Sequence, residues 1–79
     1  MTDPPGTLSM WSVYWSPKDA PGLFVARRFL VGAGLEVPQP TTDMFTADSL
    51  LEVRALLPPG LTLIPRAEAD HPVVVESWV

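Results

Sequence analysis

The absence of cysteine from a chain of only 79 residues is the feature that most limits what this sequence can fold into. A chain of this length forms one domain at most, and it buries only about 60–65% of the surface that its unfolded state exposes. Without cysteine it can form neither a disulfide nor a thiolate metal site, and its single histidine, His71, excludes paired-histidine zinc motifs. The chain therefore needs a compact core, or a partner that supplies the missing burial.

Composition places the chain among globular proteins and away from nucleic-acid binders. Apolar residues make up 47% and charged residues 18% of the sequence, and the formal net charge is −4. An acidic balance disfavours general binding of nucleic acid, which needs dense Lys and Arg to neutralise phosphates. No apolar run approaches the roughly 18 residues that span a bilayer, and the first residues lack the pattern of a signal peptide. We therefore expect a cytoplasmic protein that binds neither nucleic acid nor membrane.

Two strands and a long connection are expected in the first half of the chain. Residues 1–8 contain two prolines and a glycine and are interpreted as a disordered tail that precedes a single domain at 9–79. Residues 10–16 alternate with the period of a strand, and residues 23–31 form a second apolar run that a short turn joins to the first, so we expect antiparallel pairing. Residues 32–43 are rich in glycine and proline and are expected to be an irregular linker.

An amphipathic helix over residues 46–57 is the clearest expected element of the second half. Thr46 is a suitable N-cap, and two prolines and a glycine follow Leu57 and stop the helix. Ala47, Leu50, Leu51, Val53 and Leu57 fall on one side of a helical wheel. Leu56 is the exception, because it falls on the polar side. Arg54 falls within the apolar side, and we expect it to form a structural ion pair with Glu76 or another strand carboxylate.

The segments together predict an α+β fold. A short apolar stretch at 61–65 and a valine-rich, proline-free run at 73–79 complete the list of strands, and the last run suits an interior position. We expect a three- or four-stranded, mainly antiparallel sheet with one helix packed on one face, in the order β-β-α-β or β-β-α-β-β. The expected core consists of Trp11, Val13, Trp15, Val25, Leu50, Val53, Leu57, Val73, Val75 and Trp78. Trp78 is the least secure member, since strand alternation points it away from Val73 and Val75.

No catalytic, cofactor-binding or metal-binding residue is predicted. Asp70 and His71 form the only acid–histidine cluster, but no nucleophile stands beside them and a solvated turn explains them better. The glycines form no phosphate-binding motif. Residues 76–79 have the form of a PDZ-domain ligand, yet an interior strand has no free backbone to offer to such a partner.

The sequence from residue 11 onward resembles a group of very short uncharacterised bacterial proteins. The residues that carry the likeness are Trp11, Val13, Tyr14, Pro17, Asp19, Pro21, Phe24, Val25, the run 53–61, Pro65, Arg66 and the run 70–78. The chain departs from this pattern at 32–40. No activity, cofactor or partner is assigned to the group, so the resemblance implies a bacterial source and a shared fold and carries over no functional residue.

Two functions of different classes are compatible with the sequence. The first is a small non-catalytic protein–protein interaction or accessory domain that binds another protein or itself as a homodimer, without a cofactor. One helix covers only one face of a sheet, so aromatic residues on the other face would form an interface, unless the linker at 32–43 folds over them. The possible interface residues are Tyr14, Phe24, Phe29 and Trp78. The alternative is a small-molecule-binding or enzymatic subunit with a site between subunits around His71 and an arginine.

Overall fold

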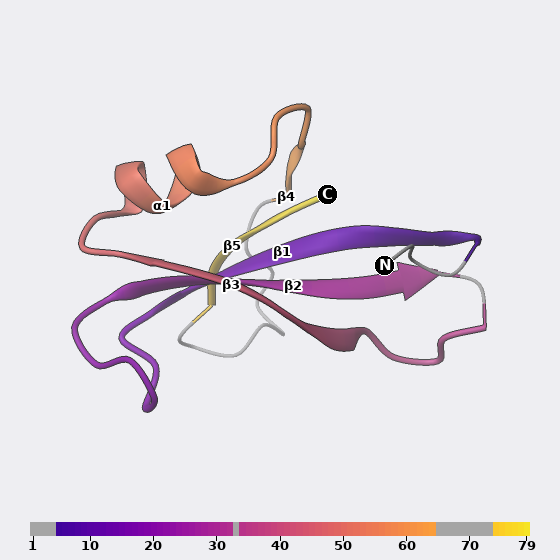
Figure 1. Cartoon of the computed structure of the whole chain (residues 1–79), viewed down its shortest axis with the longest axis horizontal. Coiled ribbons are helices and arrows are strands. Elements are labelled where there is room, and N and C mark those ends of the chain that lie inside the picture. Colours follow the sequence, from indigo (N-terminus) through magenta and orange to yellow (C-terminus); the bar gives the residue numbers. More distant parts are fainter. Residues whose placement is uncertain (1–4, 33, 65–73) are drawn as a thin grey trace.

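The computed structural model describes residues 5–32, 34–64 and 74–79, and within them it shows a five-stranded sheet and one helix (Figure 1). The elements are β1 (Thr7–Trp15), β2 (Phe24–Gly32), β3 (Gln39–Ala47), α1 (Leu50–Leu56), β4 (Leu63–Ile64) and β5 (Val74–Trp78). The predicted α+β fold, an antiparallel sheet with one helix on one face, is confirmed. The described residues hold one strand more than expected, and that strand is β3.

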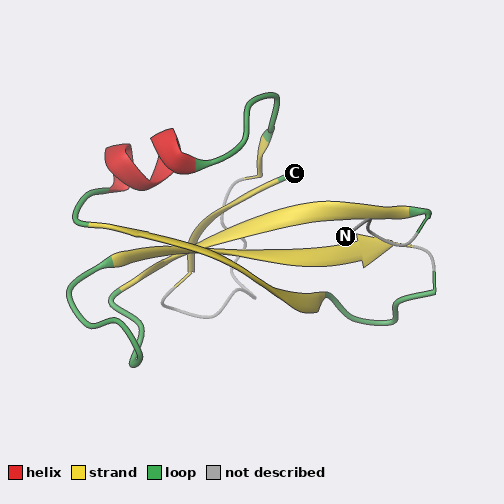
Figure 2. Cartoon of the chain, in the orientation of Figure 1, coloured by secondary structure: helices red, strands yellow, loops and turns green. Residues whose placement is uncertain are grey.

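The strands are all antiparallel and lie in the order β3-β2-β1-β5-β4. The helix packs on β2 and β3, over one end of the long strands, and the other end of the β1–β2 ribbon extends beyond it (Figure 2). We call the face that α1 covers the helix face and the reverse the opposite face. No helix among the described residues is long and apolar enough to cross a membrane.

Strand β1 shows the alternation expected from its sequence. Trp11 and Val13 point to the helix face, where they are buried, and they pair with residues of β2 in a register that runs without interruption from Thr7 to Trp15. The strand begins at Thr7, so it includes the last two residues of the segment that was expected to be a tail. Its partner β2 ends at Gly32, whose φ of 124° lies outside the range that residues with a side chain favour.

Strand β3 corrects the expectation that residues 32–43 form an irregular linker. Residues 39–43 belong to a nine-residue edge strand that lies in the plane of the sheet, so they do not fold over a face. Pro40 is tolerated because an edge strand needs hydrogen bonds on one side only. The Thr41 hydroxyl donates to the carbonyl of Arg28 beside a β-bulge, and the ring of Phe45 stacks on Trp11 with centroids 5.2 Å apart.

The helix is shorter than expected because β3 takes its first residues. Thr46 lies in β3, and the N-cap is Ser49, whose hydroxyl accepts a hydrogen bond of 3.1 Å from the backbone N–H of Glu52. The helix ends at Leu56 before the two prolines, as predicted. Its buried residue is Val53, whereas Leu51, which the wheel placed on the apolar side, is 78% exposed.

The core lies between α1 and the helix face of the sheet. Trp11, Val13, Ala26 and Val53 form its buried centre, with Phe24, Phe45, Ala47, Leu50, Leu57, Leu61, Val75 and Trp78 packed around them. Trp15 is not a core residue: β5 accompanies β1 only as far as Tyr14, so the Trp15 ring is 45% exposed and packs against Phe24. Val25 is buried, but on the opposite face and outside this cluster. Val73, also expected in the core, lies outside the described residues.

Strand β5 occupies an interior position between β1 and β4, as its sequence predicted. Trp78 lies beside Trp11 on the helix face, because a bulge in the β1–β5 pairing interrupts the simple alternation and brings Val75 into the core as well. Beyond the strand, the N–H of Val79 donates to the carbonyl of Thr62 at 3.0 Å and the N–H of Thr62 donates back at 2.6 Å. The backbone at 76–79 is therefore already paired.

Candidate functional site

The four possible interface residues do not lie on one surface. Tyr14 and Phe29 point to the opposite face, where Tyr14 pairs with Val25 and Phe29 with Met10. Phe24 and Trp78 lie on the helix face and pack against the core, which corrects the expectation that Trp78 points away from it. All four side chains are partly buried. The fold therefore divides this set between two faces.

The ion pair expected for Arg54 is present and joins α1 to β5. The Nη2 of Arg54 donates to Oε1 of Glu76 at 2.6 Å, its Nε donates to both carboxylate oxygens at 3.1 and 3.2 Å, and the indole Nε1 of Trp78 donates to Oε2. The Glu76 side chain is only 5% exposed, whereas that of Arg54 is 43% exposed. The hydrogen bonds to Glu76 raise the pKa of Arg54 above its ordinary value. The prediction of a structural ion pair is thus confirmed.

A small cavity lies beside this ion pair. It has a volume of about 120 Å³ and is lined by Arg54, Leu57, Pro58, Gly60, Leu61 and Trp78. Pockets that hold small-molecule ligands usually measure roughly 300 Å³ or more. His71, the other residue of the enzymatic alternative, lies outside the described residues together with Asp70. No contact among the described residues therefore favours that alternative.

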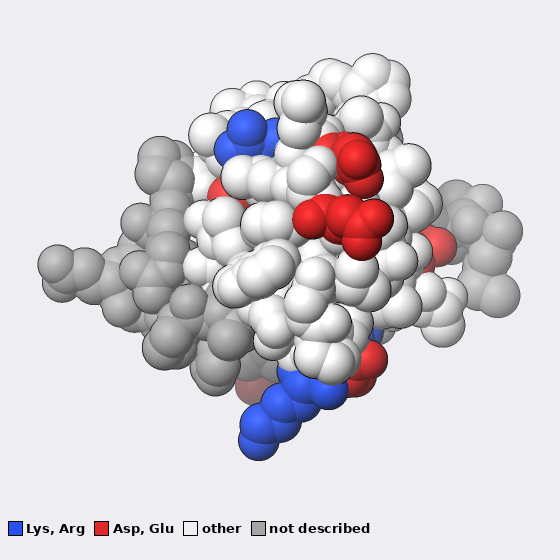
Figure 3. Space-filling view, turned by 90° about the vertical axis from the view of Figure 1, so that its left-hand side faces the viewer, with Lys and Arg blue, Asp and Glu red and all other residues white. Residues whose placement is uncertain are grey.

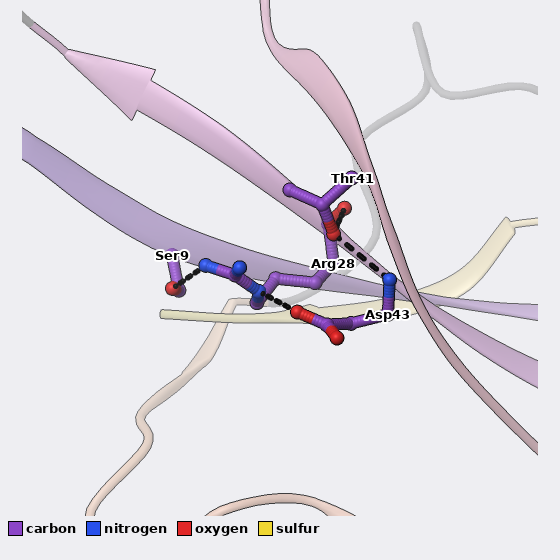
Figure 4. A network of polar contacts seen from close by, with 4 residues as sticks. All are labelled: Ser9, Arg28, Thr41 and Asp43. Atoms are coloured by element: carbon purple, nitrogen blue, oxygen red, sulfur yellow. Dashed lines mark hydrogen bonds and ion pairs between the residues drawn. The ribbon is translucent and has the colours of Figure 1, made fainter. Parts of the chain in front are cut away.

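A second polar cluster connects β1, β2 and β3 in the part of the sheet that α1 does not cover (Figure 4). In this Arg28 network, Nε of Arg28 donates to Oδ2 of Asp43 at 2.6 Å and Nη1 donates to the hydroxyl of Ser9 at 3.0 Å. The backbone N–H of Asp43 donates to the hydroxyl of Thr41 at 3.1 Å. Because Ser9, Arg28 and Asp43 come from β1, β2 and β3, the network holds adjacent strands in register, which is a structural role.

Internal ion pairs account for every arginine that the structure describes. Arg27 pairs with Asp19, and Arg28 and Arg54 pair with Asp43 and Glu76. Among the charged residues described, this leaves Lys18, Glu36, Asp48 and Glu52 without an ion pair. Three of these four, Lys18, Asp48 and Glu52, lie at the same end of the sheet, since β1 and β3 both end there and β2 begins there.

We call this surface, formed by residues 16–23 and 46–56, the end face, and Figure 3 looks onto it. Two acidic groups lie in the upper part of the view with a basic group to their left, and basic groups lie at the lower margin beside an acidic one. Mostly uncharged surface separates the upper groups from the lower ones. An open groove of about 500 Å³ crosses the end face, lined by Leu23, Thr46, Ala47, Asp48, Glu52 and Leu56. The groove thus combines apolar side chains with two unpaired carboxylates.

Such a groove can bind a segment that carries both apolar and basic side chains. Leu56 is the exposed large apolar residue among those that line the groove, with 47% of the residue accessible to solvent. One feature of the sequence pointed to this site: Leu56 is the apolar residue on the polar side of the helical wheel. Nothing in the sequence marked Leu23, Asp48 or Glu52, since the groove exists only where the turn after β3 meets the start of β2.

The comparisons with known proteins identify no relative. The chain matches no protein-family model, no curated protein and no solved structure at the significance required. Within the described parts of the chain, no group of three or more histidine, aspartate or glutamate side chains is placed to hold a metal ion. The end face is therefore the feature of the molecule from which a function can be inferred.

Proposed function

We propose that this chain is a non-catalytic protein-interaction domain that binds an apolar and basic segment of a protein partner in the groove of the end face. The observation that carries the proposal is the composition of that groove, in which Leu23, Ala47 and Leu56 lie beside the carboxylates of Asp48 and Glu52. Protein interfaces combine buried apolar anchors with polar groups at their rim in the same way.

The apolar part of the groove gives a partner a reason to bind. Leu56 ends a helix whose other side is buried, and it remains 47% exposed although it is a leucine. Covering the exposed part of a leucine side chain contributes about 1 kcal/mol at the usual 25 cal/mol per Å². Leu23 and Ala47 extend the same surface, so an apolar side chain of a partner would bury several groups at once.

The charged part of the groove determines the kind of partner. Asp48 and Glu52 both line the groove and have no ion-pair partner among the described residues. Two carboxylates that line one groove repel each other, and a lysine or arginine placed between them relieves that repulsion. The same carboxylates repel phosphate groups, so the groove favours a basic protein segment over nucleic acid.

The setting of this function is also part of the proposal. The resemblance of residues 11–79 to short bacterial proteins supports a bacterial source, and the composition supports a cytoplasmic accessory protein. In this setting the chain acts by contact and requires no cofactor.

A selection from a random peptide library displayed on phage tests the proposal. The immobilised chain should enrich peptides that contain both lysine or arginine and large apolar residues. The variant Leu56→Asp should lose this enrichment, because it places a third carboxylate in the groove and removes its main apolar contact. Leu51→Asp is the matched control: Leu51 is more exposed, at 78%, and does not line the groove. Equal selection by the Leu56→Asp and native chains would refute the proposed site.

A further inference from the structure

The end face contains both the groove and a turn with a basic side chain, Lys18, of the kind that the groove is proposed to bind. Resting on the function proposed above, we infer that the occupant of the groove is the β1–β2 turn, residues 16–22, of a second copy of this chain. Two copies then dock end face to end face about a two-fold axis, and Lys18 of each copy lies between Asp48 and Glu52 of the other.

The end face carries unpaired charges of both signs. Asp19 of the turn is neutralised by Arg27, so Lys18 gives the turn a net positive charge. Lys18 is exposed and makes no ion pair within the part of the chain that the structure describes. The carboxylates of Asp48 and Glu52 are unpaired at the same end of the sheet. The end face therefore presents an unpaired ammonium group, that of Lys18, and two unpaired carboxylates, those of Asp48 and Glu52. They form no ion pair with each other within one molecule.

A two-fold symmetric contact can match these charges. A two-fold axis that runs horizontally across the end face, in the view of Figure 3, places the upper edge of one copy against the lower edge of the other, and each contact forms twice. On the end face this operation brings the two upper acidic groups of one copy onto the lower basic groups of the other, with mostly uncharged surface between the two contacts (Figure 3). The arrangement closes with two molecules, because each copy uses its one groove and its one turn.

The shape of the turn also suits docking into a groove. It extends beyond the sheet, on the side away from α1 (Figure 1), and hydrogen bonds within the turn hold it. The Ser16 hydroxyl accepts from the N–H of Gly22 at 2.9 Å, the N–H of Ser16 donates to the carbonyl of Leu23 at 2.8 Å, and the N–H of Ala20 donates to the carbonyl of Pro17 at 3.0 Å. A turn that is ordered before binding loses little conformational entropy when it docks.

Reciprocal charge reversal tests this arrangement, with sedimentation equilibrium as the measurement. The native chain should form a dimer. Lys18→Glu alone and the pair Asp48→Lys with Glu52→Lys alone should each weaken self-association by at least about tenfold, because like charges then meet at both contacts. An equimolar mixture of the two variants should dimerise again, since every contact in the mixed dimer joins opposite charges. These residues are exposed or line an open groove, and thermal melts check that each variant stays folded.

Glu36→Lys is the matched control. Glu36 is also an exposed, unpaired carboxylate, but it lies in the connection between β2 and β3 at the far end of the sheet, so its reversal should leave the dimer intact. A native chain that stays monomeric at hundreds of micromolar overturns the inference. So does a dimer that persists in both charge variants, which would place the contact on the β3 edge or on the face of Tyr14 and Phe29. If the native chain is monomeric and Leu56→Asp still abolishes peptide selection, the dimer fails while the proposed function stands.

Discussion

The half of the sheet beneath α1 and the half beyond it are built from the same three long strands, yet they use the helix face in opposite ways. Beneath α1 this face is apolar, and Trp11, Ala26 and Phe45 pack there against the helix. Beyond α1 the same face carries the Arg28 network, whose ions and hydroxyls are partly exposed to water. One strand therefore changes from core to surface along a single face.

The opposite face does not change in this way. It carries apolar cross-strand pairs in both halves: Tyr14 with the buried Val25 at the helix end, and Met10 with Phe29 and Leu8 with Val31 beyond it. The lengths of the helix and the strands explain the change from apolar to polar on the helix face. A seven-residue helix is roughly 10 Å long at 1.5 Å per residue, whereas a nine-residue strand spans roughly 30 Å. A short helix can shield only part of a long strand from solvent. The rest of that strand face is exposed to water and therefore carries polar side chains.

The largest expected effect comes from the core beneath α1. Trp11→Ala should destabilise the fold by about 3–5 kcal/mol, because it removes a buried aromatic ring and its stack on Phe45. Urea denaturation followed by circular dichroism measures the change. Leu8→Ala, at a site on β1 that is 69% exposed, should cost less than about 0.5 kcal/mol. Similar losses in the free energy of unfolding for the two variants would contradict the distinction between a core half beneath α1 and a solvated half beyond it.

The next effect tests the ion pair that joins the helix to β5. Arg54→Met keeps the apolar stem but leaves the buried carboxylate of Glu76 with Trp78 as its remaining side-chain donor, and should cost about 2–3 kcal/mol. Glu76→Gln should cost less, since Arg54 is 43% exposed and water can solvate it. Urea denaturation of the two variants measures the losses. A larger loss for Glu76→Gln than for Arg54→Met would contradict this account.

A smaller effect is expected at the start of α1, the element that distinguishes the two halves. Ser49→Ala removes the hydroxyl that accepts from the N–H of Glu52 and should lower stability by about 1 kcal/mol. Thr46→Ala is the comparison, because Thr46 is an exposed residue of β3 and caps nothing. A greater loss for Thr46→Ala than for Ser49→Ala, measured by thermal melting, would restore the earlier helix start expected from the sequence.

The smallest effect is expected in the Arg28 network. Asp43→Asn should cost at most about 1 kcal/mol, because the Asp43 side chain is 51% exposed and surface ion pairs contribute little. The cost should fall further in concentrated salt, which screens exposed charges and barely affects buried ones. Denaturation at low and high salt measures this difference. An Asp43→Asn loss as large as that of Arg54→Met would show that the far half is not the solvated half.

The sequence predicted the elements whose patterns are local. The alternation around Trp11 and Val13 gave β1, the two prolines after Leu57 gave the end of the helix, and the position of Arg54 among apolar residues gave its ion pair. Each of these follows from a few neighbouring residues, so tertiary context was not needed to recognise it.

Elements that depend on context escaped prediction. Strand β3 contains Pro40 and several polar residues because it is an edge strand with exposed side chains, and such a composition matches a loop equally well. Thr46 and Ser49 both suit an N-cap, and only the pairing of β3 with β2 decides between them. The end face could not be predicted from the sequence. Its character depends on which charged residues remain unpaired after the ion pairs of the folded chain have formed.

The interior position of β5 governs when the molecule can be completed during its synthesis. β1 is made before the other described elements, but its second neighbour, β5, is made after all of them. A nascent hairpin of β1 and β2 therefore has an unpaired edge, with Trp11 and Val13 not yet covered. Exposed edges and apolar faces of this kind are where chaperones and aggregation act. Folding must then wait for residues 74–78, and pausing of translation before them should leave the chain open to proteolysis.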